Sequence, residues 1–232
     1  MKVIKSIILV LCLVVNLSFL YFAWEISLIN IILAFFVFCL SFIFQGAMHE
    51  VGHFIGGLLS GYKLIVLQIG RANLIGSRSG DYKLEIKMTK GGQCIMLPPD
   101  REPVRYVAYN IGGIIMNLAI TIASTILLLF NSNVATLVFL EFLLSGIFKI
   151  VSNSVPNMVN GIPTDGYIIK LLKGRPLIQG DYQKYLSLYA KIYWEEDISV
   201  DDYVYARKEE NTDDLLYYEG INDLLNDIQN KE

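Results

Sequence analysis

Apolar residues occur in four long runs along the chain, and polar residues gather between and after these runs. The runs cover residues 6–24, 28–59, 104–130 and 134–152. A helix that crosses a bilayer needs about 20 mostly apolar residues. Each run is therefore long enough for one span. The second is too long for a single crossing, so its far end is expected to protrude or to lie at the membrane surface. The pattern predicts an α-helical polytopic membrane protein with about four transmembrane helices.

The first apolar run has two interpretations. It follows Lys2 and Lys5, and a basic start before an apolar stretch is also typical of a cleaved signal peptide. However, Tyr21 and Ala23 make a poor small-x-small cleavage site. We therefore expect residues 1–27 to be retained as an additional N-terminal transmembrane span.

The segment between the second and third runs differs in kind. Residues 62–69 and 82–88 are rich in β-branched residues or alternate between polar and apolar, and residues 76–81 between them carry turn chemistry. A third short strand is expected at 93–97, directly after a pair of glycines. These features predict a small membrane-associated β-sheet.

Composition and charge agree with a membrane location. Of the 232 residues, 54% are hydrophobic, which is more than a soluble surface normally permits. Residues 1–174 carry 13 Lys and Arg against eight Asp and Glu, whereas residues 175–232 carry six against 14. The chain is thus a basic membrane part followed by an acidic tail. We expect the lipid bilayer and no nucleic acid as a partner, because phosphate binding needs concentrated positive charge.

The charge of the loops predicts an orientation. Residues 60–105 hold eight Lys and Arg, whereas the two opposite loops, around Glu25 and at 131–133, hold none. Basic loops stay in the cytoplasm. We therefore expect a multi-pass protein of the bacterial cell membrane with the sheet and both termini on the cytoplasmic side. Spacings of three and four in the tail predict amphipathic helices that pack together, with a docking surface as the alternative.

The second run carries a candidate metal site. The chain has two histidines, His49 and His53, which are four positions apart on one expected helix. Positions i and i+4 share a helix face, so both imidazoles can bind one ion. Glu50 is close enough to reach a water held by that ion, which gives the pattern two zinc ligands and a general base. The alternative is a pair of hydrogen-bonded core histidines, but ionisable groups in spans are usually functional.

The position of His49 in its run predicts its depth. The 18 residues from Ile31 to His49 span about 27 Å as a helix, and the hydrocarbon core is about 30 Å thick. A helix that enters from outside therefore brings His49 close to the cytoplasmic face, where a short path for water is feasible.

A catalytic zinc ion needs a third protein ligand and an open fourth position. Glu141 and Asp165 are the candidate carboxylates. Glu141 lies about two turns into the fourth run from its outer end, which is the wrong depth. Asp165 follows residues 157–164, whose Pro, Gly and Asn exclude a regular helix, and it precedes a short helix at 166–172. Asp165 is the favoured third ligand, and an N-cap role is its alternative.

Together these motifs resemble the site-2 protease family of intramembrane zinc metalloproteases. That family pairs a His-Glu-x-x-His helix with a later Asp-Gly ligand that follows an extended segment containing Asn and Pro. The first motif is matched by His49, Glu50 and His53 and the second by Asn157, Pro163, Asp165 and Gly166.

Two further segments fit the family. Residues 113–117 resemble its Gly-Pro-x-x-Asn motif, although Ile114 replaces the proline, and the expected sheet resembles its membrane-associated hairpin. The resemblance covers residues 28–173. The chain departs from the family at Asn160 and Thr164, where Pro and Leu are usual, and it has no insertion long enough for a PDZ domain.

The resemblance implies an activity and a cofactor. It makes residues 28–174 an intramembrane metalloprotease core and residues 175–232 an acidic cytoplasmic helical tail. A zinc ion (Zn²⁺) would be held by His49, His53 and Asp165, with Glu50 as the catalytic base. The expected substrate is a membrane-embedded small peptide precursor or a single-span regulator, and the compact architecture favours the peptide.

Four further residues are candidates for substrate binding. Gly91 and Gly92, together with residues 157–164, offer backbone edges to an extended peptide. Asn117 and Asn157 are expected to hold the substrate or the sheet in place, and hydrogen bonding between helices is the alternative for both.

Two other functions compete with this one. A metalloprotease with a downstream glutamate ligand would have to use Glu141. A transporter or immunity protein could instead contain the same ion as a structural zinc site without proteolysis.

Overall fold

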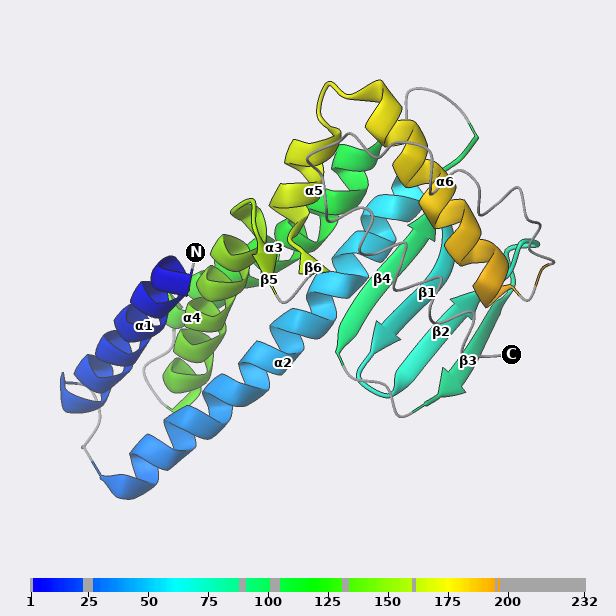
Figure 1. Ribbon diagram of the computed structural model, residues 1–232. Coiled ribbons are helices and arrows are strands. Elements are labelled where there is room, and N and C mark those ends of the chain that lie inside the picture. Colours follow the sequence, from blue (N-terminus) through cyan, green and yellow to red (C-terminus); the bar gives the residue numbers. More distant parts are fainter. Residues whose placement is uncertain are drawn as a thin grey trace.

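The computed structural model describes residues 2–22, 27–87, 91–100, 105–130, 134–159, 162–194 and 196. Helices form most of this part of the chain (Figure 1). The helices are α1 (Lys2–Phe22), α2 (Leu28–Leu59), α3 (Tyr106–Phe130), α4 (Val134–Ser154), α5 (Asp165–Leu172) and α6 (Pro176–Tyr193). The strands are β1 (Lys63–Ile69), β2 (Ala72–Gly76), β3 (Tyr82–Ile86), β4 (Gly92–Leu97), β5 (Met158–Val159) and β6 (Ile162–Pro163).

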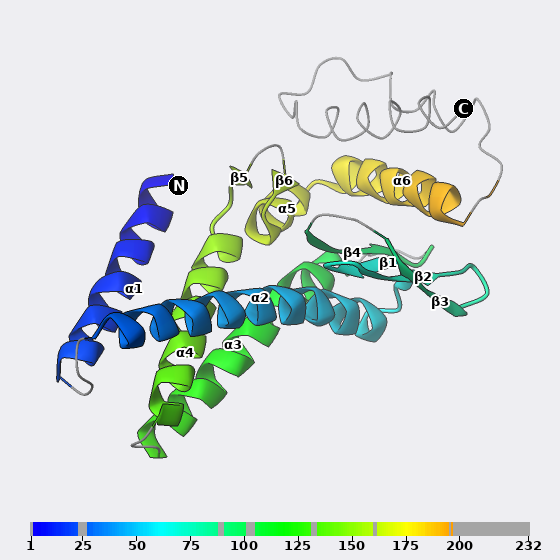
Figure 2. The same ribbon diagram turned by 90° about the horizontal axis from the view of Figure 1, so that it is seen from below.

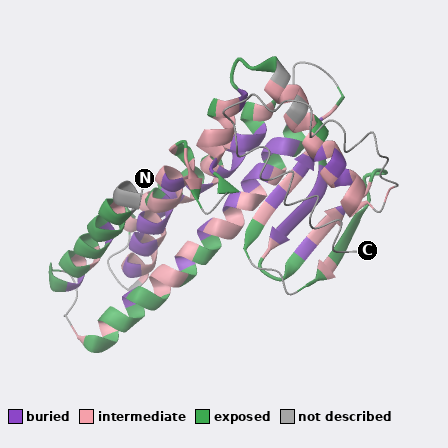
Figure 3. Ribbon diagram, in the orientation of Figure 1, coloured by how far each residue is buried: buried purple, intermediate pink, exposed green. Residues whose placement is uncertain are grey.

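Three helices are long and apolar enough to cross a membrane. They are α2, α3 and the Ala135–Ser154 part of α4. Helix α1 is apolar over the shorter stretch Ser6–Phe22. Large apolar side chains are exposed along α1, the first half of α2 and the outer side of α3 (Figure 3). These properties are those of a membrane protein, and the expected fourth span, at α1, stays a prediction.

Helices α2 and α3 are in direct backbone contact. Gly52 and Gly112 face each other, and a Cβ atom on either one would collide with the backbone carbonyl of the other. Small residues permit this kind of close helix packing in membranes. Helix α4 completes the bundle. Helix α1 packs against α4 through a cluster of Cys12, Leu140 and Leu144.

The sheet is antiparallel, with the strand order β3-β2-β1-β4. The sequence predicts the strands now labelled β1, β3 and β4, but β2 is an addition. Residues 70–71 form a tight turn with Gly70 at a φ of +58°, so the chain reverses at once and residues 72–76 pair with β1. The turn expected at 76–81 then joins β2 to β3.

The sheet lies between α2 and α6 (Figure 2). On one face, Tyr62, Leu64 and Met96 form a buried cluster with Tyr109 of α3 and with Phe54 of α2 packed against it. On the other face, α6 packs against β1 and β4. The first amphipathic helix expected in the tail is thus present and packs on the sheet. The second, at residues 215–228, lies outside the described residues.

Candidate metal centre

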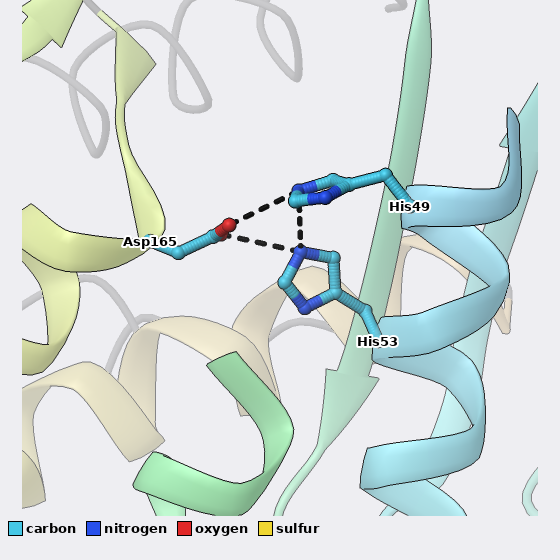
Figure 4. Close-up of side chains that lie close together, drawn as sticks. All are labelled: His49, His53 and Asp165. Carbon is cyan, nitrogen blue, oxygen red and sulfur yellow. Dashed lines mark hydrogen bonds and ion pairs between the residues drawn. The ribbon is translucent and has the colours of Figure 1, made fainter. Parts of the chain in front are cut away.

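Helix α2 presents both histidines on one face, in the half of the helix that reaches the sheet. His49 and His53 are buried, and their Nε2 atoms lie 3.1 Å apart (Figure 4). This is the geometry that the i, i+4 spacing predicts, because one helical turn separates the two side chains.

Hydrogen bonds on the opposite ring nitrogens orient both imidazoles. His49 Nδ1 lies 2.7 Å from Asn117 Oδ1, and His53 Nδ1 lies 2.9 Å from the backbone carbonyl oxygen of Tyr109. Carbonyl oxygens only accept hydrogen bonds, so each Nδ1 donates its proton and each Nε2 keeps a lone pair. The two lone pairs are directed at the same point. A second partner that orients the ring in this way is typical of histidine ligands to metals.

The partners of Asn117 determine which way its amide points. Its Nδ2 donates to the backbone oxygen and to the Oε1 atom of Gln45, both at 2.7 Å. Gln45 Nε2 in turn donates to the backbone oxygen of Phe142 at 3.1 Å. These contacts determine which atom of each amide is the nitrogen and which is the oxygen, so the Oδ1 atom of Asn117 faces His49. The chain joins α4, α2 and α3 to one metal-ligand candidate.

Asp165 arrives from the other side of the site on a short hairpin. Strands β5 and β6 pair with each other, and Thr164 closes the hairpin by donating from Oγ1 to the backbone oxygen of Val155 at 2.9 Å. Thr164 also accepts a hydrogen bond from the Tyr167 amide as the N-cap of α5. Asp165 is therefore the first residue inside the helix, and the N-cap alternative for its side chain is wrong.

The carboxylate of Asp165 reaches both imidazoles. Its Oδ2 lies 3.0 Å from His49 Nε2 and its Oδ1 lies 3.2 Å from His53 Nε2. Its two oxygens are thus directed at two nitrogen lone pairs, an arrangement of electron-pair donors that suits a cation between them.

This group of donor atoms fits a metal ion. The three residues can offer ligand atoms that lie within 4.8 Å of one another, and among the described residues they form the only such group. A tetrahedral ion with bonds of about 2.0–2.2 Å separates its ligand atoms by about 3.3–3.5 Å, within a few tenths of an ångström of the distances found. Three protein ligands also leave one coordination position open.

Two other carboxylates named by the sequence lie in different surroundings. Glu141 is fully buried and accepts a hydrogen bond from Asn16 Nδ2 at 3.2 Å, so the structure does not bring it to the histidines. Glu50 lies beside the first residue of β4, with its Oε1 3.6 Å from the position that a Cβ on Gly92 would occupy. Glu50 thus faces the beginning of this edge strand.

Gly113 of α3 forms the floor beneath the two imidazoles. A Cβ atom there would lie 2.6 Å from His49 Cε1 and 2.7 Å from His53 Nε2. Such contacts are shorter than van der Waals separation, so any side chain at this position must displace the rings. The glycine at the start of the 113–117 motif is therefore needed to leave space for the two imidazole rings.

Gly113→Ala is expected to lower the affinity for the metal ion by about 100-fold, the upper range for disturbed ligand orientation. The measurement is competition with a chelating dye in the purified protein. Gly180→Ala on α6 is the matched control, because nothing lies within 4 Å of the added methyl group. Equal affinities of the two variants would contradict the steric role of Gly113.

Comparisons with family models, curated proteins and solved structures were made with the whole chain. None finds a match. The resemblance to site-2 proteases therefore stays a prediction that rests on the motifs and on the geometry of the site.

The remaining residues expected at the site lie around its entrance or behind it. Asn117 is fully buried, and its whole amide is engaged with His49 and Gln45. It therefore orients the imidazole ring of His49. Asn157 donates from Nδ2 to the Met158 backbone oxygen at 2.8 Å and helps to shape the hairpin before Asp165. Gly91 turns the chain into β4 with a φ of +102°.

Sequence reasoning missed three residues that build the site. Gln45 and Tyr109 support the histidines, and Thr164 sets the position of Asp165. Gln45 could have been recognised from the sequence, because it is a polar residue one turn before His49 in an otherwise apolar run. Tyr109 acts through its backbone oxygen, so its side-chain identity gives no sign of the role.

Proposed function

We propose that this chain is an intramembrane zinc metalloprotease of the site-2 type. It hydrolyses a peptide bond within or next to the membrane-spanning segment of a small peptide precursor or a single-span regulator. The observation that carries the proposal is the convergence of two oriented imidazoles and a carboxylate on one point. Both imidazoles belong to α2, which is long enough to span a membrane. Glu50 directly follows His49 in the sequence.

The donor set supports zinc as the ion. Two neutral imidazole nitrogens and one carboxylate oxygen form a common ligand set of catalytic zinc, and the open fourth position accommodates water or substrate. Zinc in such a site lowers the pKa of a water molecule and polarises a carbonyl group. His49, His53 and Asp165 would hold the ion. Glu50 would accept a proton from the attacking water and return it to the leaving amine.

A strand at the end of the described sheet supports peptide binding. Strand β4 lies at the end of the described sheet order, and a Cβ atom on its first residue would lie 3.2 Å from Glu50 Cγ. An extended peptide can add to such an edge through backbone hydrogen bonds. A peptide aligned there from Gly91 and Gly92 onward would pass the catalytic base. The absence of a side chain at residue 92 keeps this passage open.

One face of the sheet supports contact with the membrane surface. Tyr82, Leu84 and Ile86 alternate along β3 and are 53%, 66% and 75% exposed. Tyr82 also packs against Phe54 of α2, so these side chains lie on the α2 side of the sheet. This apolar face suits contact with a lipid surface. Because residues 60–105 carry eight Lys and Arg, we propose that the sheet and both termini lie on the cytoplasmic side.

Removal of the ion is expected to stop peptide cleavage. Purified wild-type protein in proteoliposomes should contain about one zinc ion per chain and cleave single-span reporter peptides. A strong chelator should abolish cleavage, and stoichiometric zinc should restore it, because hydrolysis needs the activated water. Metal analysis and mass spectrometry of the products make the measurement. Cleavage that persists after complete removal of the ion would exclude the metalloprotease. An ion that binds without any cleavage would favour a structural zinc site.

A further inference from the structure

One basic residue lies within the candidate membrane spans. The three spans contain Glu50, Glu141 and Lys149 as their charged residues. A charge inside a membrane helix is unfavourable, and residues that keep one there usually act on a substrate or an ion. Glu141 is paired with Asn16 and Glu50 has the proposed role of catalytic base, which leaves the function of Lys149 to be explained.

The side chain of Lys149 crosses from α4 onto α2. Its Nζ atom lies 4.0 Å above the centroid of the Phe42 ring, a favourable cation–π contact. The same atom lies 3.3 Å from the position that a Cβ on Gly46 would occupy. Gly46 therefore leaves the space that the ammonium group fills, and Phe42 supports the group from one side.

The ammonium group lies beside the middle of α2, near Phe42 and Gly46. Ser41 contacts the Glu141 backbone and Gln45 the Phe142 backbone, so α2 and α4 run in the same direction. Helix α2 runs toward the sheet (Figures 1 and 2). Gly46 therefore lies farther from the sheet than Glu50.

This position is next to the catalytic machinery. Gly46, Glu50 and His53 share one face of α2 at the i, i+4 and i+7 spacings. Cβ positions four residues apart on a helix are about 5–6 Å apart, and the ammonium group lies beside the Gly46 position. The ammonium group therefore lies about one helical turn from the residue that carries the Glu50 side chain. A peptide bound at Glu50 would therefore have its neighbouring residues within reach of this ammonium group.

We propose that Lys149 binds a carboxylate of the substrate beside the scissile bond. This inference rests on the proposed protease function and names a substrate class, which is peptides with a carboxylate one or a few residues from the bond that is cut. The ammonium group supplies a charge-assisted hydrogen bond that is strengthened by the low dielectric of its surroundings. The carboxylate can belong to an Asp or Glu side chain or to the C-terminus of a small peptide.

Peptide binding to the Glu50→Gln protein tests the inference without cleavage. Zinc-loaded protein in detergent micelles is titrated with fluorescent apolar peptides that carry a single Asp, scanned through positions around the cleavage site, or Asn in its place. At one position, the Asp peptide is expected to bind about 30-fold more tightly. Peptides that end in a free acid or an amide test the C-terminal carboxylate in the same way. Lys149→Met in this background should remove the preference.

Two further variants make the outcome specific. Lys149→Glu should reverse the preference and favour a Lys peptide at the same position, whereas Lys170→Met on α5 should retain the wild-type preference. The inference is overturned if acidic and neutral peptides bind equally, if the preference persists in Lys149→Met, or if no peptide binds. If wild-type protein leaves the bound acidic peptides intact, the protease function fails while the carboxylate site stands.

Discussion

Glu50→Gln should lower the rate of peptide cleavage by about 10³-fold or more, toward the upper range for the loss of a general acid–base group. Glutamine has nearly the same size and can occupy the same space beside Gly92, but it cannot accept the proton of the attacking water. The metal ion should remain bound, because His49, His53 and Asp165 make up the ligand group. Cleavage of a single-span reporter and metal content are measured in the same preparation.

Glu85→Gln is the matched control for this substitution. Lys83 and Lys87 hold the pKa of the Glu85 carboxyl at about 2 through hydrogen bonds at the surface of β3. Its loss should therefore change surface ion pairs, which contribute little, and leave cleavage unchanged. Reporter processing by the Glu50 variant at the wild-type rate would remove the protease function while leaving the metal centre intact.

Asp165→Ala should weaken metal binding by more than the roughly 100-fold that the loss of an outer hydrogen-bond partner produces. The substitution removes the only anionic member of the group and leaves two imidazole nitrogens, whose Nε2 atoms lie 3.1 Å apart. Peptide cleavage should be lost with the ion. Affinity is measured by competition with a chelator of known strength, and circular dichroism verifies that the helices remain folded.

Glu141→Gln separates the two candidate third ligands. Glutamine at 141 can still accept the hydrogen bond from Asn16 through its amide oxygen, so the packing of α1 on α4 should persist. The ion should bind with wild-type affinity. If the Glu141 variant loses the ion and the Asp165 variant keeps it, the assignment of the third ligand is wrong.

The elements that the sequence predicts well are those with a strong periodic signal. Apolar runs identify the three candidate spans to within about two residues, because a membrane helix must be apolar over its whole length. The spacing of His49 and His53 predicts their shared helix face for a similar reason, since the helical repeat alone determines it. Asp165 could be proposed because the segment before it cannot continue a helix.

The elements that the sequence does not reveal depend on tertiary contacts. Strand β2 is short and contains Asn73 and Gly76, so its propensity is weak and its pairing with β1 and β3 decides its conformation. The hydrogen-bonded chain from Phe142 to His49 joins residues that are far apart in the sequence. Lys149 is visible in the sequence as the one basic residue of its apolar run, but only the packing of α4 on α2 places its ammonium group beside Gly46, one turn before Glu50.

The chain of hydrogen bonds from the Phe142 carbonyl through Gln45 and Asn117 to His49 links three helices to one ligand. At the proposed metal site, helix association and ion binding would therefore be parts of one cooperative equilibrium. The ring of His49 acquires its binding orientation only when α3 and α4 have docked on α2. In return, an ion that binds only the assembled bundle stabilises it by mass action. The resistance of this protein to heat should thus rise with the concentration of free metal.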